Sequence, residues 1–503
     1  MYFLCFLYFF TFFAKPVDKF CNRVYNKKYT KEVIGLKFRK IACFALAMVA
    51  VFTISSCKKA EKEREKAVVD TNDDYIQHLK IEDYDGYNFR ILTRKDMIDN
   101  QYIEEETGDI INDAVYRRNE TVKALFNIDI TAIESVSTTA DDAISSILAG
   151  DDQYDIILPH ARTAFSYAIQ NTLVNFHEVD TIHLDKPWWS KDIVDSCSVN
   201  GHLYVLDGDI STHRLYYSYA LFFNKTIFDE LGLEYPYEMV LDGEWTFDEM
   251  KKIAKKGSKD LSGDGIMHPD VDQYGYYGVD WYGPIAVLYT GGQRIYTKDA
   301  RGVPKLTLNS AKTVDIFAEY FDLLMSDDAY LKKESVSIAS DPFREGRALI
   351  AEKCLGEAQS LRNMSDDFGI LPYPKFSDDD EYTTIIGGGS SLVVMPVTVE
   401  DISRTGNITE ALCAIGSRDV IPAFYEISLK TKFSRDAESE AMVDIIKDSL
   451  IYDLGYISGG TFQSAGRDLA QLNNPDFSSY YAANESQAII KLQEFNRSYG
   501  KIG

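Results

Sequence analysis

The chain has 503 residues, with 53 Lys and Arg against 78 Asp and Glu, so its formal net charge is −25. Residues 1–56 are basic, with a charge of +7, and the rest of the chain therefore carries −32. This balance argues against nucleic-acid binding, because phosphates need Lys and Arg to neutralise them. It also opposes adhesion to anionic lipid, so attachment to a membrane would require an anchor.

The region before Cys57 has the pattern of an export signal. Basic residues at Lys37, Arg39 and Lys40 precede a short apolar run, residues 41–54, and small residues come directly before Cys57. Small residues followed by a cysteine resemble the lipobox of bacterial lipoproteins. The resemblance implies that the signal is cut before Cys57 and that this cysteine carries acyl chains. The exported chain is then expected on the outer face of the cytoplasmic membrane.

A membrane-spanning helix is the alternative interpretation of the apolar run. Residues 41–54 make only 14 positions, whereas a spanning helix needs about 20. Residues 1–35 do not fit a normal signal, because a second apolar stretch and a basic segment come first. Either the true start lies near Val33 or Leu36, or these residues form an extra anchor. Residues 1–56 are therefore kept out of the fold prediction.

The cysteines after the signal indicate a protein without a disulfide framework. Only Cys197, Cys354 and Cys413 follow Cys57. Their odd number and wide spacing match neither a set of disulfides nor a metal-ligand pattern, so buried free thiols are expected. Residues 57–85 begin with a charged segment poor in apolar side chains, which predicts a solvated tether after the lipidated cysteine.

The first elements after the tether alternate between strands and helices. The apolar periodicity predicts strands over residues 87–93, 128–131 and 154–158, and helices over residues 110–126 and 140–148. The second helix is expected to stop at Gly150. Strands that alternate with helices predict an α/β lobe with a mostly parallel sheet.

A series of segments then follows in an order that is typical of one family. They read Tyr-Asp-Ile-Ile (154–157), Leu-Val-Asn-Phe (173–176), Trp-Trp (188–189), Asn-Gly-His-Leu-Tyr-Val-Leu (200–206), Ile-Phe-Asp-Glu-Leu-Gly-Leu (227–233), Trp-Thr-Phe-Asp-Glu-Met (245–250), Phe-Arg-Glu-Gly-Arg-Ala-Leu-Ile (343–350) and Phe-Gly-Ile-Leu-Pro-Tyr-Pro (368–374). This succession resembles the extracellular solute-binding proteins (family 1, maltose-binding-like) of bacterial ABC sugar importers. The resemblance covers about residues 87–500 and depends on the order of the segments rather than on any single one.

The resemblance implies an α/β fold of the periplasmic-binding-protein-like type II, with two α/β lobes, a hinge and a ligand cleft between the lobes. The expected lobes are residues 86–216 plus 396–455 and residues 217–393 plus 460–500. The implied function is the substrate-binding component of an ABC transporter. It would capture a carbohydrate, expected to be an oligosaccharide, and deliver it to the permease subunits in the membrane. A monomer is expected, with no catalysis and no cofactor.

Two other functions stay open at this point. The same bilobed domain could pass its ligand to a membrane receptor as a sensor. A glycoside-processing enzyme could use a pair among the many carboxylates. No sequence feature singles out such a pair, and the chain has no GxSxG, HExxH or Walker motif. We therefore favour a binding protein over an enzyme.

The cleft of an open α/β sheet lies beyond the carboxyl ends of its strands, and this position selects candidate ligand-binding residues. His160 and Arg162 directly follow the strand over residues 154–158, although Arg162 could instead pair with a carboxylate. Asp207 and Asp209 lie before the expected first crossing between lobes. A carboxylate suits a sugar diol, because each oxygen can accept from a hydroxyl. The Asp-Gly pair is equally typical of a turn.

Aromatic residues are the other candidates. The resemblance implies an aromatic sugar platform near Trp281 and Tyr282, and Trp281 is our best single site residue. The alternative is a buried core aromatic. Trp188 and Trp189 are also candidates; in a strand they would point to opposite faces, so at most one could reach a ligand.

The expected crossings between the lobes contain the candidate hinge residues. These are Tyr216 at the first crossing and Gly387, Gly388 and Gly389 just before the second. The chain departs from maltose-type members near residues 352–361. An aromatic side chain is expected there, and Cys354, Glu357 and Gln359 occur instead, which puts a linear malto-oligosaccharide in doubt.

One acidic segment resembles the start of a calcium loop. Asp260, Ser262 and Asp264 occupy loop positions one, three and five, and Gly265 occupies position six. Position twelve is Val271, where a bidentate Glu is expected. A structural calcium ion is therefore a weak candidate, and an acidic surface turn is the alternative.

Overall fold

The computed structural model describes residues 73–334, 341–430 and 437–501. The predicted signal, the lipidation site Cys57 and most of the tether lie outside the described residues. Within the described ranges, no helix is long and apolar enough to cross a membrane. The predicted free thiols Cys197, Cys354 and Cys413 are confirmed, and all three are buried.

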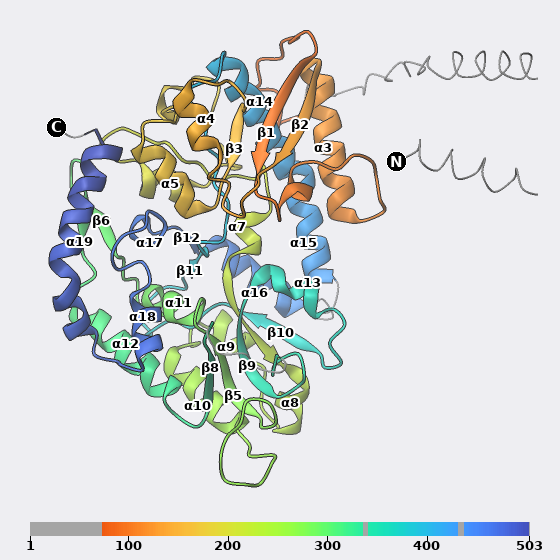
Figure 1. Cartoon of the computed structure of the whole chain (residues 1–503). Helices are drawn as coiled ribbons and strands as arrows, with labels where there is room; N and C mark the ends of the chain where they lie inside the picture. The colour runs from red at the N-terminus through yellow and green to blue at the C-terminus, as the bar shows by residue number, and fades with distance from the viewer. Residues whose placement is uncertain (1–72, 335–340, 431–436, 502–503) are drawn as a thin grey trace, which may run out of the picture. The chain divides into compact units, whose positions relative to one another are not determined.

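Lobe 1 is built on a parallel sheet with the strand order β2-β1-β3 (Figure 1). Its strands are β1 (Tyr87–Thr93), β2 (Ile128–Glu134) and β3 (Ile156–Leu158). Its helices are α3 (Ile110–Phe126), α4 (Ala143–Ala149), α5 (Ala161–Ile169), α6 (Lys191–Cys197) and α7 (His213–Tyr216), with short turns η1 (Ile98–Asn100) and η2 (Phe176–Glu178). The predicted order of strands and helices is confirmed. Helix α4 ends at Gly150, as predicted.

Helix α3 shows why this part of the chain folds as predicted. Asp109 caps its first turn by accepting hydrogen bonds from the backbone N–H groups of Ile111 and Asn112. Asn127 ends the helix in the left-handed conformation, which an Asn tolerates better than most residues. Val122 and Phe126 then lie on the buried face, against the sheet.

Lobe 2 is built on a mixed sheet with the strand order β10-β4-β9-β5-β8. Its strands are β4 (Tyr219–Asn224), β5 (Tyr274–Val279), β8 (Ala329–Lys332), β9 (Ala348–Cys354) and β10 (Phe368–Leu371), and a separate hairpin consists of β6 (Tyr296–Lys298) and β7 (Pro304–Leu306). Its helices are α8 (Lys225–Glu230), α9 (Tyr237–Leu241), α10 (Phe247–Gly257), α11 (Gly283–Thr290), α12 (Ala311–Leu324) and α13 (Ala358–Leu361), with η3 (Leu355–Glu357). Strand β4 is antiparallel to β9 and β10, whereas β5 is parallel to β8 and β9.

The C-terminal part of the chain contributes to both lobes. It contains β11 (Thr384–Ile385), α14 (Ile402–Ile415), η4 (Gly416–Val420), α15 (Ile421–Lys430), α16 (Ala437–Asp448), β12 (Leu450–Ile451), α17 (Leu454–Ile457), α18 (Ala465–Leu472) and α19 (Phe477–Tyr499). Isolated bridges place Val393 beside Leu206 and Val394 beside Ile157, so this segment extends the sheet of lobe 1.

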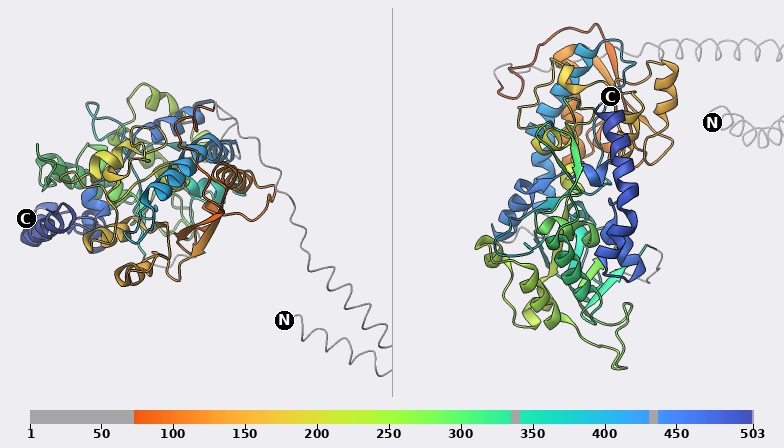
Figure 2. Two further views of the ribbon diagram at one scale, coloured as in Figure 1. Left: turned by 90° about the horizontal axis from the view of Figure 1, so that it is seen from above. Right: turned by 90° about the vertical axis from the view of Figure 1, so that its left-hand side faces the viewer.

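The helices of the C-terminal part contact both predicted lobes. Within residues 396–455, assigned to lobe 1, helix α14 contacts α3, but α16 contacts β10 and α9 of lobe 2. Helix α19 contacts β7 and α12 of lobe 2 and also α5 of lobe 1, and it lies along both lobes in Figure 2. The exact lobe boundaries stay a prediction.

Candidate functional site

Three glycines lie where the chain passes between the lobes, and aromatic rings explain why they are glycines. A Cβ atom on Gly387 would lie 2.6 Å from the ring of Tyr219, and one on Gly389 would lie 2.7 Å from the ring of Tyr217. Real Cβ atoms do not approach other atoms so closely. The Gly387 N–H donates to the carbonyl of Tyr217 at 2.8 Å. The predicted hinge glycines are thus packed directly against the first crossing.

A row of aromatic side chains connects this segment with both lobes. The rings of Tyr219 and Tyr282 are 5.0 Å apart, and the hydroxyls of Tyr219 and Tyr456 are 3.3 Å apart. The Arg162 guanidinium lies over the ring of Tyr456, 5.2 Å from its centre. The row therefore runs from α5 of lobe 1 to the start of α11 in lobe 2. We call Arg162, Tyr456, Tyr219 and Tyr282 the junction row.

Arg162 is the charged member of the junction row. It lies in the first turn of α5 and is half-buried. Its Nε is buried and has no hydrogen-bond partner within the described ranges. No carboxylate of those ranges forms an ion pair with it, which was the alternative considered for this residue. A guanidinium placed in this way can still donate hydrogen bonds to a ligand.

A second arginine lies beside the glycines. Arg94 follows β1, is 5% exposed, and donates from Nη1 to the Gly389 carbonyl at 2.5 Å and from Nη2 to Asp96 at 3.0 Å. Burial, together with Arg94 and Arg162, lowers the pKa of His160 to about 4. His160 is therefore a neutral imidazole at neutral pH, and its Nδ1 accepts from the backbone N–H of Arg162 at 3.3 Å.

Trp281 lies at the end of β5, next to Tyr282 of the junction row. The Arg467 guanidinium lies 3.4 Å from the centre of the Trp281 ring and donates to Glu334 at 2.7 Å. One face of Trp281 is therefore already covered by a cation. The Tyr282 hydroxyl donates to Glu357 at 2.9 Å. The two predicted platform residues thus differ: Tyr282 belongs to the row, and Trp281 flanks it.

Asp207 and Asp209 are buried around one arginine. Arg214 of α7 donates from Nη2 to Asp209 at 2.5 Å, and its Nε is 3.8 Å from Asp207. Burial raises the pKa of Asp207 to about 6, and it also raises the pKa of Asp209. The structure thus places both carboxylates in an ion-pair cluster with Arg214.

Trp188 and Trp189 both contact a single carboxylate. Their indole N–H groups donate to Glu410 of α14 at 3.1 and 2.7 Å, respectively. Both side chains are 3% exposed. Because the two residues lie in a turn rather than a strand, the rule of opposite faces does not apply, and both rings reach the same partner.

In the acidic loop of lobe 2, backbone N–H groups of the loop itself donate hydrogen bonds to the carboxylates of Asp260 and Asp272. Asp260 accepts from the backbone N–H groups of Gly263 and Gly265 at 2.6 and 2.8 Å. Asp272 accepts from three backbone N–H groups of the same loop. These bonds lower the pKa of both carboxyl groups. Ser262 also donates to Asp260, and the calcium ion suggested for Asp260, Ser262 and Asp264 stays a prediction.

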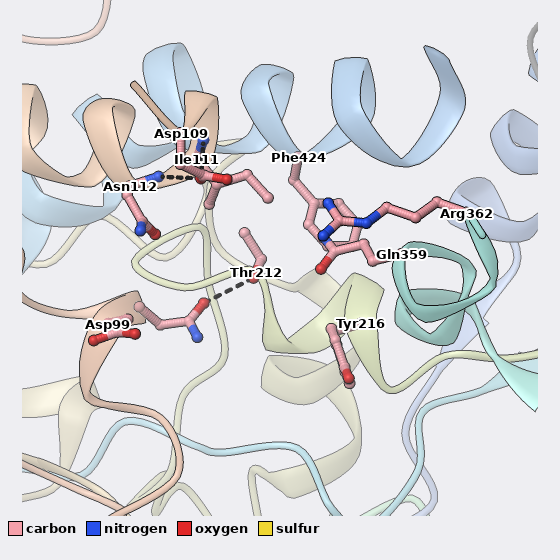
Figure 3. A pocket seen from close by; sticks show the side chains of 10 residues that line it. Asp99, Asp109, Ile111, Asn112, Thr212, Tyr216, Gln359, Arg362 and Phe424 are labelled. Carbon is pink, nitrogen blue, oxygen red and sulfur yellow. Dashed lines mark hydrogen bonds between the residues drawn. The ribbon is translucent and has the colours of Figure 1, made fainter. Parts of the chain in front are cut away.

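A cavity of about 230 Å³ lies beside the first crossing (Figure 3). Its lining residues are Asp99, Asn100, Asp109, Ile111, Asn112, Thr212, Tyr216, Gln359, Arg362 and Phe424. Tyr216 is a hinge candidate, and Gln359 occurs in the segment where maltose-type members are expected to have an aromatic side chain. Both residues therefore face the same cavity. Thr212 donates to Asn100 at 2.9 Å across the wall of lobe 1.

Sequence reasoning missed four residues around the junction: Arg94, Tyr217, Tyr219 and Tyr456. Arg94 directly follows the strand over residues 87–93, so the strand-end argument used for Arg162 would have found it. Tyr217 and Tyr219 lie at the predicted first crossing. No local signal distinguishes Tyr456, which only the fold brings beside Arg162.

Comparisons with known proteins identify the fold. No family model matches the chain, and no curated protein matches its sequence. A cyclic alpha-maltosyl-1,6-maltose binding protein from Arthrobacter globiformis is similar in structure, with a TM-score of 0.54, 14% identity, and coverage of 83% of this chain and 98% of the other. UgpB from Mycobacterium tuberculosis, solved with glycerophosphocholine, has a TM-score of 0.54 and 14% identity, with coverage of 81% of this chain and 98% of the other. An ABC substrate-binding protein from Listeria monocytogenes, solved with cycloalternan, has a TM-score of 0.50 and 12% identity, with coverage of 83% of this chain and 99% of the other. The predicted fold class, with two α/β lobes, is confirmed.

Proposed function

We propose that the chain is the substrate-binding component of an ABC importer and that it captures a carbohydrate outside the cell. Its fold is that of ABC substrate-binding proteins. One of the similar structures holds cycloalternan, and another is a cyclic alpha-maltosyl-1,6-maltose binding protein. The carbohydrate would pass to permease subunits in the membrane, whose ATPase partners supply the energy. The chain itself would have no catalytic role and would act as a monomer.

The observation that carries this proposal is the junction row with its unpaired arginine. Tyr282, the partly exposed ring of the row, offers an apolar face on which a sugar ring can stack, whereas Tyr219 and Tyr456 are buried behind it. Arg162, whose Nε has no hydrogen-bond partner in the described ranges, offers donors for sugar oxygens. Because the row includes residues of both lobes, a ligand bound to it would contact both lobes at once and favour their closure. Binding would then be coupled to the shape that the permease recognises.

The location of the protein is part of the same proposal. Cys57 would carry the lipid anchor, and residues 58–72 would tether the folded part to the outer face of the cytoplasmic membrane. The net charge of −32 beyond residue 56 supports an anchor, because an acidic surface is not attracted to anionic lipid.

The test is a thermal-shift screen followed by calorimetry on Arg162→Ala. A sugar that binds only the folded state stabilises it by about 2.7 kcal/mol at a hundredfold excess over Kd. We expect one class of oligosaccharide to shift the unfolding temperature and to be recovered intact. Arg162→Ala should weaken its binding on the order of tenfold or more, the value of a hydrogen bond to a charged group.

Arg117→Ala is the matched control, since Arg117 lies on the surface of α3 with a side chain 55% exposed. It should leave sugar binding unchanged. Binding that is identical in the wild type and Arg162→Ala would remove the junction row from the site. A screen in which peptides shift the unfolding temperature and no sugar does would overturn the carbohydrate proposal.

A further inference from the structure

Two histidines and a glutamate converge on the surface of lobe 1. His78 lies just after the tether, His183 lies in the loop between η2 and α6, and Glu410 lies in α14. Within the described ranges, these three form the one group of three or more His, Cys, Asp and Glu side chains whose ligand atoms lie within 4.8 Å of one another. The group therefore brings together three segments far apart in the sequence.

The distances from both histidines to the carboxylate match the spacing of ligands around a metal ion. His78 Nε2 lies 3.2 Å from Glu410 Oε1, and His183 Nδ1 lies 3.5 Å from the same oxygen. Nitrogen and oxygen ligands about 2.0–2.1 Å from a tetrahedral Zn²⁺ are separated by roughly 3.3 Å. The imidazole nitrogens are thus spaced from the carboxylate oxygen as zinc ligands are.

The hydrogen bonds of Glu410 hold one oxygen of its carboxylate towards the histidines. Oε2 accepts from the Trp189 indole at 2.7 Å and from the His183 backbone N–H at 3.2 Å. Oε1 accepts from the Trp188 indole at 3.1 Å. A carboxylate oxygen has two lone pairs. The second lone pair of Oε1 faces His78 Nε2, 3.2 Å away, and a metal ion would take the place of the hydrogen bond between these two atoms. The two indoles hold the carboxylate in this orientation, as partners of metal ligands commonly do.

The electrostatics of the cluster also favour a cation. The Glu410 side chain is fully buried, and no Lys or Arg of the described ranges forms an ion pair with it. A buried carboxylate without a cationic partner is costly, and a metal ion supplies the missing positive charge. The Nδ1 of His183 is buried and has no hydrogen-bond partner in the same ranges.

We propose that His78 Nε2, His183 Nδ1 and Glu410 Oε1 bind one Zn²⁺ ion. Two imidazoles and one carboxylate are a donor set suited to Zn²⁺. A water molecule would complete the tetrahedron as the fourth ligand. The ion fastens the segment around His78 onto α14.

The first experiment is a titration of the untagged protein, stripped with a chelator, against Zn²⁺ and against Mg²⁺ as the control cation. We expect one Zn²⁺ per chain, a higher unfolding temperature with Zn²⁺ alone, and slower hydrogen exchange over residues 73–80. Co²⁺ in the same site should give the visible absorption of a tetrahedral complex. A wild type that binds no Zn²⁺ would overturn the proposal without any variant.

Variants then assign the ligands. His78→Ala and His183→Ala should each weaken Zn²⁺ binding at least about a hundredfold, since loss of a second-sphere partner alone costs 10–100-fold. His268→Ala is the matched control, because His268 is 48% exposed in the acidic loop of lobe 2. If the histidine variants bind Zn²⁺ as the wild type does, the ion lies elsewhere and the proposal is wrong.

Discussion

Gly387 and Gly388 are neighbours in the sequence but meet very different surroundings. A Cβ atom on Gly387 would lie 2.6 Å from the rigid ring of Tyr219. One on Gly388 would lie 3.2 Å from Arg162 Nε and from the Tyr456 hydroxyl, so these neighbours would need to move by only a few tenths of an ångström. The closer contact at Gly387 requires a larger shift of a packed ring, so the two positions should respond differently to the same added methyl group.

We expect Gly387→Ala to lower the free energy of unfolding by about 1–3 kcal/mol, the usual cost of overpacking. Gly388→Ala is the internal comparison and should cost less stability. Denaturant unfolding of both variants measures the difference. Equal losses in the two variants would show that the Tyr219 ring moves aside and does not restrict residue 387.

Protonation of His213, a buried residue of α7, is expected to lower the stability of the protein in acid. His213 is 1% exposed, and burial, assisted by Arg94, lowers its pKa from 6.5 to about 3, while Asp96 opposes the shift. The unfolded chain binds a proton at this residue below about pH 6.5, whereas the folded chain does not. The stability contributed by neutral His213 is therefore complete above pH 6.5 and is lost as the pH falls towards 3.

We expect wild-type stability to fall more steeply between pH 7 and pH 4 than that of His213→Gln. The difference in slope should reach at most about 1.4 kcal/mol per pH unit, the value for one proton. The free energy of unfolding at a series of pH values is the measurement. Parallel profiles for the two proteins would mean that His213 is as easily protonated in the folded state as in the unfolded one.

At the residue scale, the candidate residues were predicted from their position along the chain. Arg162 was identified because it follows a strand of the α/β lobe, and the structure places it in the junction row. Asp207 and Asp209 were selected because they precede the expected first crossing, and the structure buries both around Arg214. Which polar residues after a strand face a cleft depends on neighbours such as Arg214, and these neighbours are set by the packing of α7.

At the scale of elements, local pairing was predictable and distant pairing was not. The parallel sheet of lobe 1 follows from strands and helices that alternate within a short stretch of chain. In lobe 2, β4 pairs with β9 and β10, which lie far along the sequence. Helix α16 likewise contacts β10 across a long sequence separation. No periodicity in either segment encodes its partner.

Helix α19 is the element that contacts both lobes on one side of the junction. Near its start, Phe477 packs against Phe317 of α12 with ring centres 5.1 Å apart. At its end, the Tyr499 hydroxyl donates to the Cys197 carbonyl at 3.0 Å, and the Tyr499 ring stacks on Phe165 at 5.7 Å. A helix fixed at both ends in this way resists a change in the separation of the lobes along that side.

Removing one attachment should release part of this restraint. We expect Tyr499→Ala to cost about 3–5 kcal/mol of stability, as for other buried aromatic residues. Hydrogen exchange in the last turns of α19 should accelerate in this variant. Tyr499→Phe keeps the ring and removes only the hydroxyl, so it should cost about 1 kcal/mol. If exchange in α19 is unchanged in Tyr499→Ala, its end is held by other contacts.

At the scale of the whole molecule, the negative charge of the chain opposes binding to an anionic membrane. The chain beyond residue 56 carries −32, so an anionic membrane surface repels it. The membrane attachment that we propose would then have to come from apolar insertion. Two acyl chains hold a protein stably at a bilayer, whereas one holds it only marginally. Cys57, although outside the described residues, is therefore the position on which membrane location is expected to depend.

We expect Cys57→Ser to move the protein from the membrane fraction to the soluble fraction after cell lysis, with sugar binding unchanged. High salt should release none of the wild type, because ionic attraction does not hold it. Fractionation with immunodetection measures both. A Cys57→Ser protein that stays in the membrane would assign the anchor to an apolar stretch, either within residues 1–35 or over residues 41–54. Repeating the experiment on a chain that starts at Val33 separates these two stretches, since only residues 41–54 could then hold the Cys57→Ser protein.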